Sequence, residues 1–101
     1  MVVYIAGPYR GATPYQVERN IAHAKEHALL VWKRGHVALC PHMNTAHFDG
    51  ELPDDVWMDG AMELLSRCDV VYAIPGWQDS EGTLSEIRFA ELNGIKVVYG
   101  I

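Results

Sequence analysis

Residues 69–98 indicate the fold of this chain most clearly, and they read DVVYAIPGWQDSEGTLSEIRFAELNGIKVV. The β-rich run DVVYAI, residues 69–74, is stopped by a Pro-Gly pair. A helical stretch follows, ends at Asn93-Gly94 and leads into a second β-rich run, IKVVYGI, residues 95–101. A strand, a helix and another strand in this order are typical of two parallel strands joined by a right-handed crossover.

The same alternation is present from the first residues onward. VVYIA, residues 2–6, predicts a strand that is stopped by Gly-Pro. Residues 12–35 predict a long helix, with Thr13 as its N-cap, Pro14 at its first helical position and Gln16 completing a capping box. Apolar residues recur at spacings of four and three and predict one buried stripe of this helix: Val17, Ile21, Ala24, Ala28 and Val31.

The middle of the chain continues the pattern with a strand over residues 36–40, a polar segment over residues 41–55 and a helix over residues 56–68. The predicted order is therefore strand-helix three times and then a last strand. This order predicts a single α/β domain over residues 1–101. We expect a Rossmann-like or flavodoxin-like three-layer sandwich, with a parallel sheet of four to five strands covered by helices on both faces.

Ligands of such sheets bind outside the carboxyl ends of the strands. Three stretches rich in polar and turn residues follow the first three predicted strands. They are GPYRG at residues 7–11, PHMNTAH at residues 41–47 and PGWQDSEG at residues 75–82. Because the fold brings these stretches to one edge of the sheet, the sequence predicts a binding site where they meet.

Charge and composition exclude several classes of function. The net charge of −5 and the pI near 5.4 argue against binding duplex nucleic acid, which favours a basic surface. No apolar run reaches the ~20 residues that cross a membrane, and the N-terminus does not have the pattern of a signal peptide. We therefore expect a cytoplasmic protein in which Cys40 and Cys68 are reduced and buried.

Glu86 has two interpretations at this stage. It fits a capping box in which Thr83 caps the helix and Glu86 reaches back to the amide of Thr83. It also fits a reactive carboxylate, because Gly82 allows a ligand to approach the backbone closely. Ser80 and the free amides of the first helical turn then provide a site for an anion.

Other residues of the three loops also have two interpretations. Arg10 is either a solvated arginine in a turn or a fork that binds phosphate. Trp77 either covers the helix below it or stacks on a nucleobase. His42, Asn44 and His47 match no standard zinc spacing and fit the polar wall of a pocket better, so we expect neither a metal nor a cofactor.

With these residues in view, the chain resembles the nucleoside 2-deoxyribosyltransferase-like superfamily. VYIAGPYRG, residues 3–11, is similar to that family's first strand and loop. Residues 68–98 are similar to its nucleophile region and last strand. The chain is also similar to 2'-deoxynucleoside 5'-monophosphate N-hydrolases, which carry an arginine in the first loop and a serine before the glutamate.

This resemblance implies a role for each matching residue. Glu86 matches the nucleophile that attacks C1' of the sugar, and Tyr4 matches the tyrosine that orients it. Arg10 and Ser80 match positions that hold a 5'-phosphate. The substrate-binding residues that we expect are Gly7, Pro8, Tyr9, Arg10, Gly11, His42, Trp77, Ser80 and Gly82.

The implied function is cleavage of a base–sugar bond, by hydrolysis or deoxyribosyl transfer, on a nucleotide or nucleoside and most simply on a 5'-monophosphate. The alternatives are a module that binds or sequesters a nucleotide in the same pocket without cleaving it, and a dimer scaffold with no ligand. Apolar residues on two sides of the last helix, among them Phe89 and Leu92, predict a homodimer or a higher homo-oligomer.

One position departs from the family. Many members carry an Asp eight residues before the Asp that opens the third strand, and Ala61 stands at that position here. Asp59 lies two residues earlier, which is about 200° around an undistorted helix. As the group that protonates the leaving base we rank Asp59 first, ahead of Asp79 and a histidine of the second loop.

Overall fold

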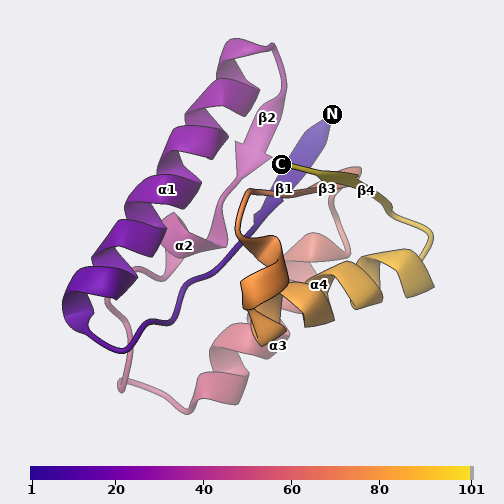
Figure 1. Ribbon diagram of the computed structural model, residues 1–101. Coiled ribbons are helices and arrows are strands. Elements are labelled where there is room, and N and C mark those ends of the chain that lie inside the picture. The colour runs from indigo at the N-terminus through magenta and orange to yellow at the C-terminus, as the bar shows by residue number, and fades with distance from the viewer. Residues whose placement is uncertain (101) are drawn as a thin grey trace.

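The structure is a computed structural model that describes residues 1–100, and it confirms the α/β class (Figure 1). Nine elements alternate along this part of the chain, one of them the short 3₁₀ helix η1. They are β1 (Val2–Ala6), α1 (Pro14–Lys33), β2 (Val37–Leu39), α2 (Pro41–Asn44), α3 (Asp54–Leu65), β3 (Val70–Ala73), η1 (Trp77–Asp79), α4 (Glu81–Leu92) and β4 (Lys96–Tyr99).

The strands form one parallel sheet. Within the described residues its order is β2-β1-β3-β4, so β1 lies inside the sheet and pairs with a strand on each side. Tyr4 of β1 lies opposite Leu39 of β2 and opposite Val71 of β3. All four strands therefore end at the same edge of the sheet, as the sequence predicts.

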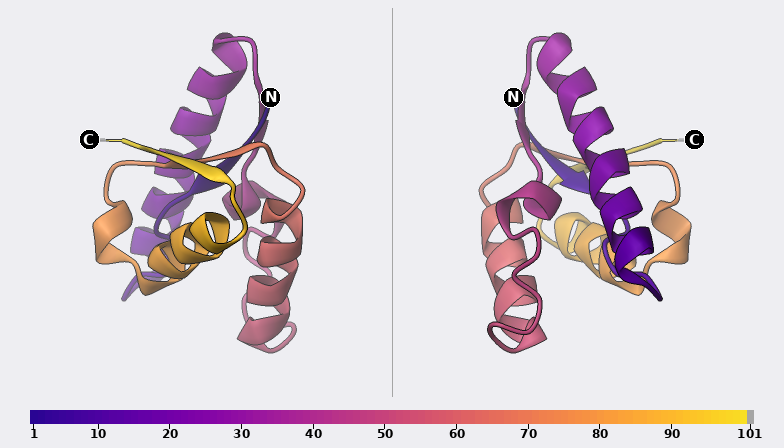
Figure 2. Two further views of the ribbon diagram at one scale, coloured as in Figure 1. Left: turned by 90° about the vertical axis from the view of Figure 1, so that its right-hand side faces the viewer. Right: turned by 90° about the vertical axis from the view of Figure 1, so that its left-hand side faces the viewer.

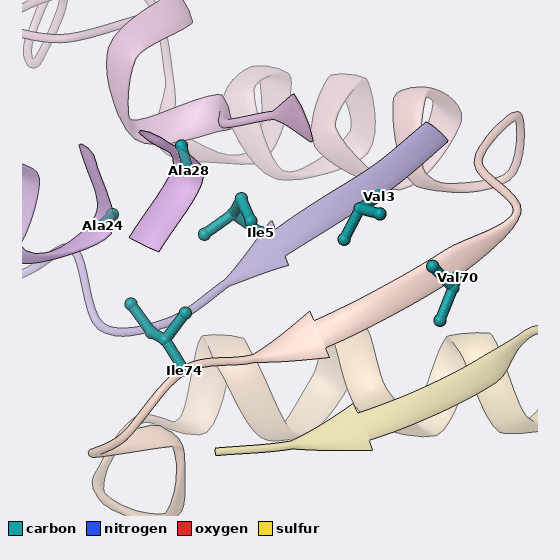
Figure 3. Packing of buried hydrophobic residues seen from close by; sticks show 6 residues of the cluster. All are labelled: Val3, Ile5, Ala24, Ala28, Val70 and Ile74. Carbon is teal, nitrogen blue, oxygen red and sulfur yellow. The ribbon is translucent and has the colours of Figure 1, made fainter. Parts of the chain in front are cut away.

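Helices cover both faces of the sheet and complete the three layers (Figure 2). On the face covered by α1, a cluster of apolar side chains packs between helix and sheet: Val3, Ile5, Ala24, Ala28, Val70 and Ile74 (Figure 3). On the face covered by α3 and α4 the buried cluster is Tyr4, Ala6, Leu65, Cys68, Val71 and Ala90. The alternation of side chains along β1 supplies both clusters.

The start of α1 has the predicted cap. The Thr13 hydroxyl accepts a hydrogen bond from the Gln16 amide at 3.2 Å, and the Gln16 side-chain oxygen accepts one from the Ala12 amide at 2.7 Å. The apolar stripe is also present, with Ile21, Ala24 and Ala28 buried and Val17 and Val31 half-buried. Local sequence alone is sufficient to specify this helix.

The segment predicted to be polar and irregular differs from expectation. It contains α2, which begins with Pro41 at the first helical position, where the N–H that proline lacks has no partner in the helix anyway. The side chain of His42 in this helix is buried. Helix α3 also begins two residues earlier than predicted, because Asp54 and Asp55 complement the positive end of its dipole.

At the other end of the chain, β4 is shorter than the predicted strand, and Ile101 lies outside the described residues. Both cysteines are free thiols; Cys68 is buried and Cys40 is half-buried. Among residues 1–100, no helix combines the length and the hydropathy needed to cross a membrane.

A glycine at the end of β1 fixes how closely the first loop approaches the core. A Cβ added at Gly7 would lie 2.5 Å from two carbon atoms of the fully buried Ile74 side chain. We expect Gly7→Ala to lower the free energy of unfolding by about 1–3 kcal/mol, the usual cost of overpacking. Gly60→Ala is the matched control, because a Cβ there meets nothing within 4 Å in the middle of α3. The free energy of unfolding of Gly60→Ala, measured with urea, should be about 0.5–1 kcal/mol higher than that of the unsubstituted protein. Equal stabilities for the two variants would contradict the packing argument.

Candidate active site

A cavity of about 830 Å³ opens at the carboxyl ends of the strands. Its wall includes residues of the loop after β1, of α2 and the segment that follows it, of α3, and of the start of α4. The three loops that the sequence singles out therefore contribute to one site. A cavity of this size holds a ligand as large as a nucleotide.

Glu86 lies in the wall of this cavity and is hydrogen-bonded to a residue of the core beneath it. The hydroxyl of Tyr4, which is fully buried in β1, donates a hydrogen bond to Oε2 of Glu86. Burial raises the pKa of the Glu86 carboxyl from its ordinary value of 4.5 to about 7, although the hydrogen bond from Tyr4 acts in the opposite direction. Burial, and next the charge of Glu86, raise the pKa of Tyr4 well above 10.0, so the phenol remains a donor.

The capping-box interpretation of Glu86 is wrong. The N-cap of α4 is Ser80, whose hydroxyl accepts the amide of Thr83 at 3.2 Å, and Thr83 itself is buried inside the first turn. Gly76, with a φ of 96°, and the short helix η1 carry the chain to a helix start three residues earlier than that interpretation required. Glu86 therefore bonds to Tyr4 instead of to its own helix.

Arg10 stands at the rim of the cavity. Its Nη2 lies 3.0 Å from a carboxylate oxygen of Asp54, and both side chains are mostly exposed. The loop that carries Arg10 is tied to α1, because Asn20 donates to the carbonyl oxygens of Tyr9 and Arg10 at 3.0 and 3.1 Å. The guanidinium is thus anchored through its backbone and still open to a ligand.

His42 contributes a buried imidazole to the same wall. Its Nε2 donates to the carbonyl oxygens of Gly7 and Pro8, both at 3.0 Å, which leaves Nδ1 without a proton. Burial lowers the pKa of His42, more than the two carbonyl contacts raise it. Beside it, Tyr9 donates to a carboxylate oxygen of Asp49 at 2.7 Å. The wall therefore presents a neutral histidine at pH 7.

Most residues that the sequence predicts for substrate contact lie in this wall: Gly7, Pro8, Tyr9, Arg10, Gly11, His42, Ser80 and Gly82. Trp77 is not among the lining residues. Its indole N–H donates to the Gly100 carbonyl at 3.3 Å, and its ring packs on Tyr99 with centroids 4.8 Å apart. The structure thus gives Trp77 contacts at the end of β4 and none in the cavity.

Asp59 is also outside the cavity and is exposed. The side of α3 that lines the cavity carries Asp54, Trp57, Met58, Ala61 and Met62, which recur at helical spacing. Ala61 is therefore in the wall, at the position where the family resemblance leads us to expect a carboxylate. Asp59 falls on another side of the helix, so the structure does not bring our first-ranked proton donor to the site.

Sequence reasoning missed Trp57, Asp49 and Asp54 as parts of the wall. The spacing from Asp54 through Trp57 to Ala61 carried the signal, since it marks one side of a helix. The wall also contains Asp79 and Glu81, so carboxylates outnumber its one guanidinium. Among residues 1–100, no group of three or more His, Cys, Asp or Glu side chains is arranged to hold a metal ion.

The burial of Glu86 makes stability depend on pH. The folded protein binds the Glu86 proton up to a pH of about 7, whereas the unfolded chain releases it near 4.5, so stability falls as the pH rises through this window. Glutamine at this position does not titrate. We expect the free energy of unfolding of Glu86→Gln, relative to that of the unsubstituted protein, to rise by on the order of 3 kcal/mol from pH 4 to pH 8.

Urea unfolding at both pH values measures this difference. Glu91→Gln, at an exposed position of the same helix, is the control for the loss of one negative charge. A constant difference between Glu86→Gln and the unsubstituted protein across the window would contradict the predicted burial of the carboxylate.

Comparison with solved structures shows where this fold occurs. The chain is similar to a 2-deoxyribosyltransferase from Bacillus psychrosaccharolyticus, with a TM-score of 0.74 and 17% identity over 98% of this chain and 71% of the other. It is similar to a 2-desoxiribosyltransferase from Leishmania mexicana, with a TM-score of 0.68 and 20% identity over 97% of this chain and 62% of the other.

A third similar structure is the CMP N-glycosidase BcmB of Clostridium botulinum, with a TM-score of 0.61 and 20% identity over 98% of this chain and 67% of the other. The chain thus spans 62% to 71% of the length of these three proteins. No curated protein sequence matches it. The predicted resemblance to nucleoside 2-deoxyribosyltransferases is confirmed in the fold. The family model described as "Domain of unknown function (DUF4406)" matches residues 1–99, and the chain belongs to this family.

Proposed function

We propose that this protein cleaves the N-glycosidic bond of a nucleoside 5'-monophosphate, with Glu86 as the nucleophile. One observation carries the proposal: a half-buried carboxylate in the wall of a nucleotide-sized cavity accepts a hydrogen bond from a fully buried tyrosine. This is the arrangement that an activated carboxylate nucleophile requires, since its partner orients it and disperses its charge. The named activities of the structural relatives, deoxyribosyl transfer and CMP N-glycosidic cleavage, support the same class of reaction.

The reaction proceeds in two displacements. Tyr4 holds Oε2, so Oε1 of Glu86 attacks C1' of the sugar and forms an ester. The bond between C1' and the base nitrogen breaks, and its electron pair leaves with the base, which takes up a proton. Water, or a second base acting as acceptor, then attacks C1' and gives up a proton to solvent. The bond between C1' and Oε1 breaks, its electron pair returns to Glu86 as carboxylate, and the sugar leaves bonded to the attacking group. Only ionised Glu86 attacks, and its pKa near 7 means that both forms are present at neutral pH.

The first loop and the start of α4 are the parts of the wall that favour a phosphate. Arg10 offers donors beyond the one that faces Asp54. Ser80 accepts from Thr83 through its oxygen and keeps its own proton free to donate. Glu81 and Gly82, the first residues of α4, line the same wall. Their backbone N–H groups have no acceptor within the helix and can bind an anion.

The leaving base needs a proton donor, and Ala61 supplies none. Asp79 lies in the cavity wall next to the cap of α4, whereas Asp59 lies outside the wall. His42 is a poor donor, because its one ring proton is held by two backbone carbonyls. Asp79, however, adjoins the residues that we propose for the phosphate, so we name no side chain for this step and the leaving base takes its proton from water.

A second function is favoured by one observation, the alanine at position 61 of the wall. Without a carboxylate there, the same pocket serves a module that binds a nucleotide and does not cleave it. Such a module is distinguished by a ligand-dependent rise in melting temperature with no release of base. In either case a homo-oligomer remains our expectation, because Leu92 on the outer side of α4 is 80% exposed.

The nucleophile is tested by removing the charge of Glu86 while keeping its shape. We expect Glu86→Gln to abolish release of base from nucleoside 5'-monophosphates and to retain binding, because the amide accepts from Tyr4 but does not attack C1'. Chromatography of released base and calorimetric titration measure the two effects. Asp59→Asn is the companion variant, since its exposed side chain lies outside the cavity. Retained turnover in Glu86→Gln would sink the assignment, and lost turnover in Asp59→Asn would restore Asp59 as proton donor.

The phosphate subsite is tested at Arg10. We expect Arg10→Gln to raise the KM for a monophosphate about tenfold or more, because a charge-assisted hydrogen bond is lost, and to leave the KM for the free nucleoside unchanged. Arg19→Gln removes an equal charge from the exposed side of α1 and is the control. Equal changes for nucleotide and nucleoside would show that Arg10 does not contact the phosphate.

A further inference from the structure

Three buried side-chain atoms find no hydrogen-bond partner among residues 1–100. They are Nδ1 of His42, Nε1 of Trp57 and Oγ1 of Thr83. All three residues line the cavity that contains Glu86. Buried polar atoms in native proteins nearly always have partners, and each exception calls for an explanation. Their restriction to one wall indicates that a ligand of this cavity supplies the missing partners.

Whether each atom is a hydrogen-bond donor or an acceptor determines which group the ligand must place opposite it. His42 donates through Nε2 to two carbonyls, so its Nδ1 is only an acceptor and requires an N–H or O–H. The indole of Trp57 is only a donor and requires a lone pair. Thr83 accepts both kinds of partner, and its side chain is 1% exposed. It lies one turn before Glu86 on the same side of α4, beside the place where C1' must sit.

We propose that Trp57 and His42 form the subsite for the base, and that Thr83 bonds to the sugar next to C1'. This inference rests on the proposed function, because Glu86 defines the position of C1'. The base is then a planar heterocycle that presents a lone pair to the Trp57 N–H and an N–H to His42 Nδ1. All three atoms are closed off from water in the free chain, so this proposal requires that binding turns the three side chains toward the ligand.

The chain contains a natural comparison for Trp57. Trp77 has the same donor, but its N–H is bonded to the Gly100 carbonyl and it does not line the cavity. Phenylalanine removes the N–H and keeps an aromatic ring at either position. At Trp57 the substitution removes an unpartnered donor, so the free protein should be as stable or more stable. At Trp77 it breaks an existing hydrogen bond, so the free protein should be less stable.

The experiment measures binding in the Glu86→Gln background, where cleavage does not interfere. Calorimetric titration with the four 2'-deoxynucleoside 5'-monophosphates identifies the tightest ligand. We expect Trp57→Phe to weaken that ligand about fivefold and to leave the melting temperature equal or higher. Trp77→Phe should lower the melting temperature and leave the affinity unchanged. Thr83→Val should weaken binding by a similar factor, and Thr83→Ser should restore it.

Each result supports or overturns the inference. Unchanged affinity in both Trp57→Phe and Thr83→Val overturns the inference. If the unsubstituted protein still releases base in that case, the proposed function stands without the inference. Unchanged affinity in Trp57→Phe, with a melting temperature lowered as much as in Trp77→Phe, shows that the indole has a structural role only, which also overturns it. Absence of binding by all four monophosphates, and of base release by the unsubstituted protein, overturns the inference together with the proposed function.

Discussion

The hydrogen bond between Tyr4 and Glu86 connects the core of this protein to its candidate active site. Tyr4 belongs to the buried cluster under α4, packed with Val71 and Ala90, and its hydroxyl is the one polar atom that it brings there. A carboxylate in such a place loses most of its hydration, and the phenol replaces part of it. The position of α4 over the sheet therefore sets the pKa of Glu86, so the packing of the core controls the charge of this carboxyl.

The sheet places this pair. Because β1 lies between β2 and β3, Tyr4 is held from both sides by neighbouring strands, and the loop after β1 opens at the centre of the sheet edge. Gly7 lets that loop turn close over Ile74, which directs Arg10 toward α3. From the other side, the left-handed residue Gly76 and the cap at Ser80 bring the start of α4 to the same edge. The adjacent strands β1 and β3 thus place both Tyr4, the partner of Glu86, and the loops that line the cavity.

The sequence predicted what depends on local patterns, and it failed where the outcome depends on helix phase or on distant contacts. The parallel sheet follows from the alternation of strands and helices, whereas the cap at Thr13 and the buried stripe of α1 follow from residue spacing; all three are confirmed. One of the two interpretations of Glu86 placed the cap of α4 at Thr83, because the turn at Gly76 and η1 that moves the cap to Ser80 has no clear signal in the sequence. The sequence left Trp77 with two interpretations and did not single out Trp57. A loop position allowed Trp77 to stack on a ligand, whereas the phase of α3 brings Trp57 to the cavity.

The cavity wall combines features that weaken the free protein and suit it to a ligand. It contains Asp49, Asp54, Asp79, Glu81 and Glu86 beside the single guanidinium of Arg10, and these like charges repel one another. Such a wall attracts an anion only at Arg10 and the first amides of α4, which is why the proposed phosphate subsite is placed there. The rest of the wall, with Trp57, Met58 and Met62, is apolar enough for a planar base. In the proposed function, these two parts of the wall would receive the phosphate and the base, with the sugar between them over Glu86.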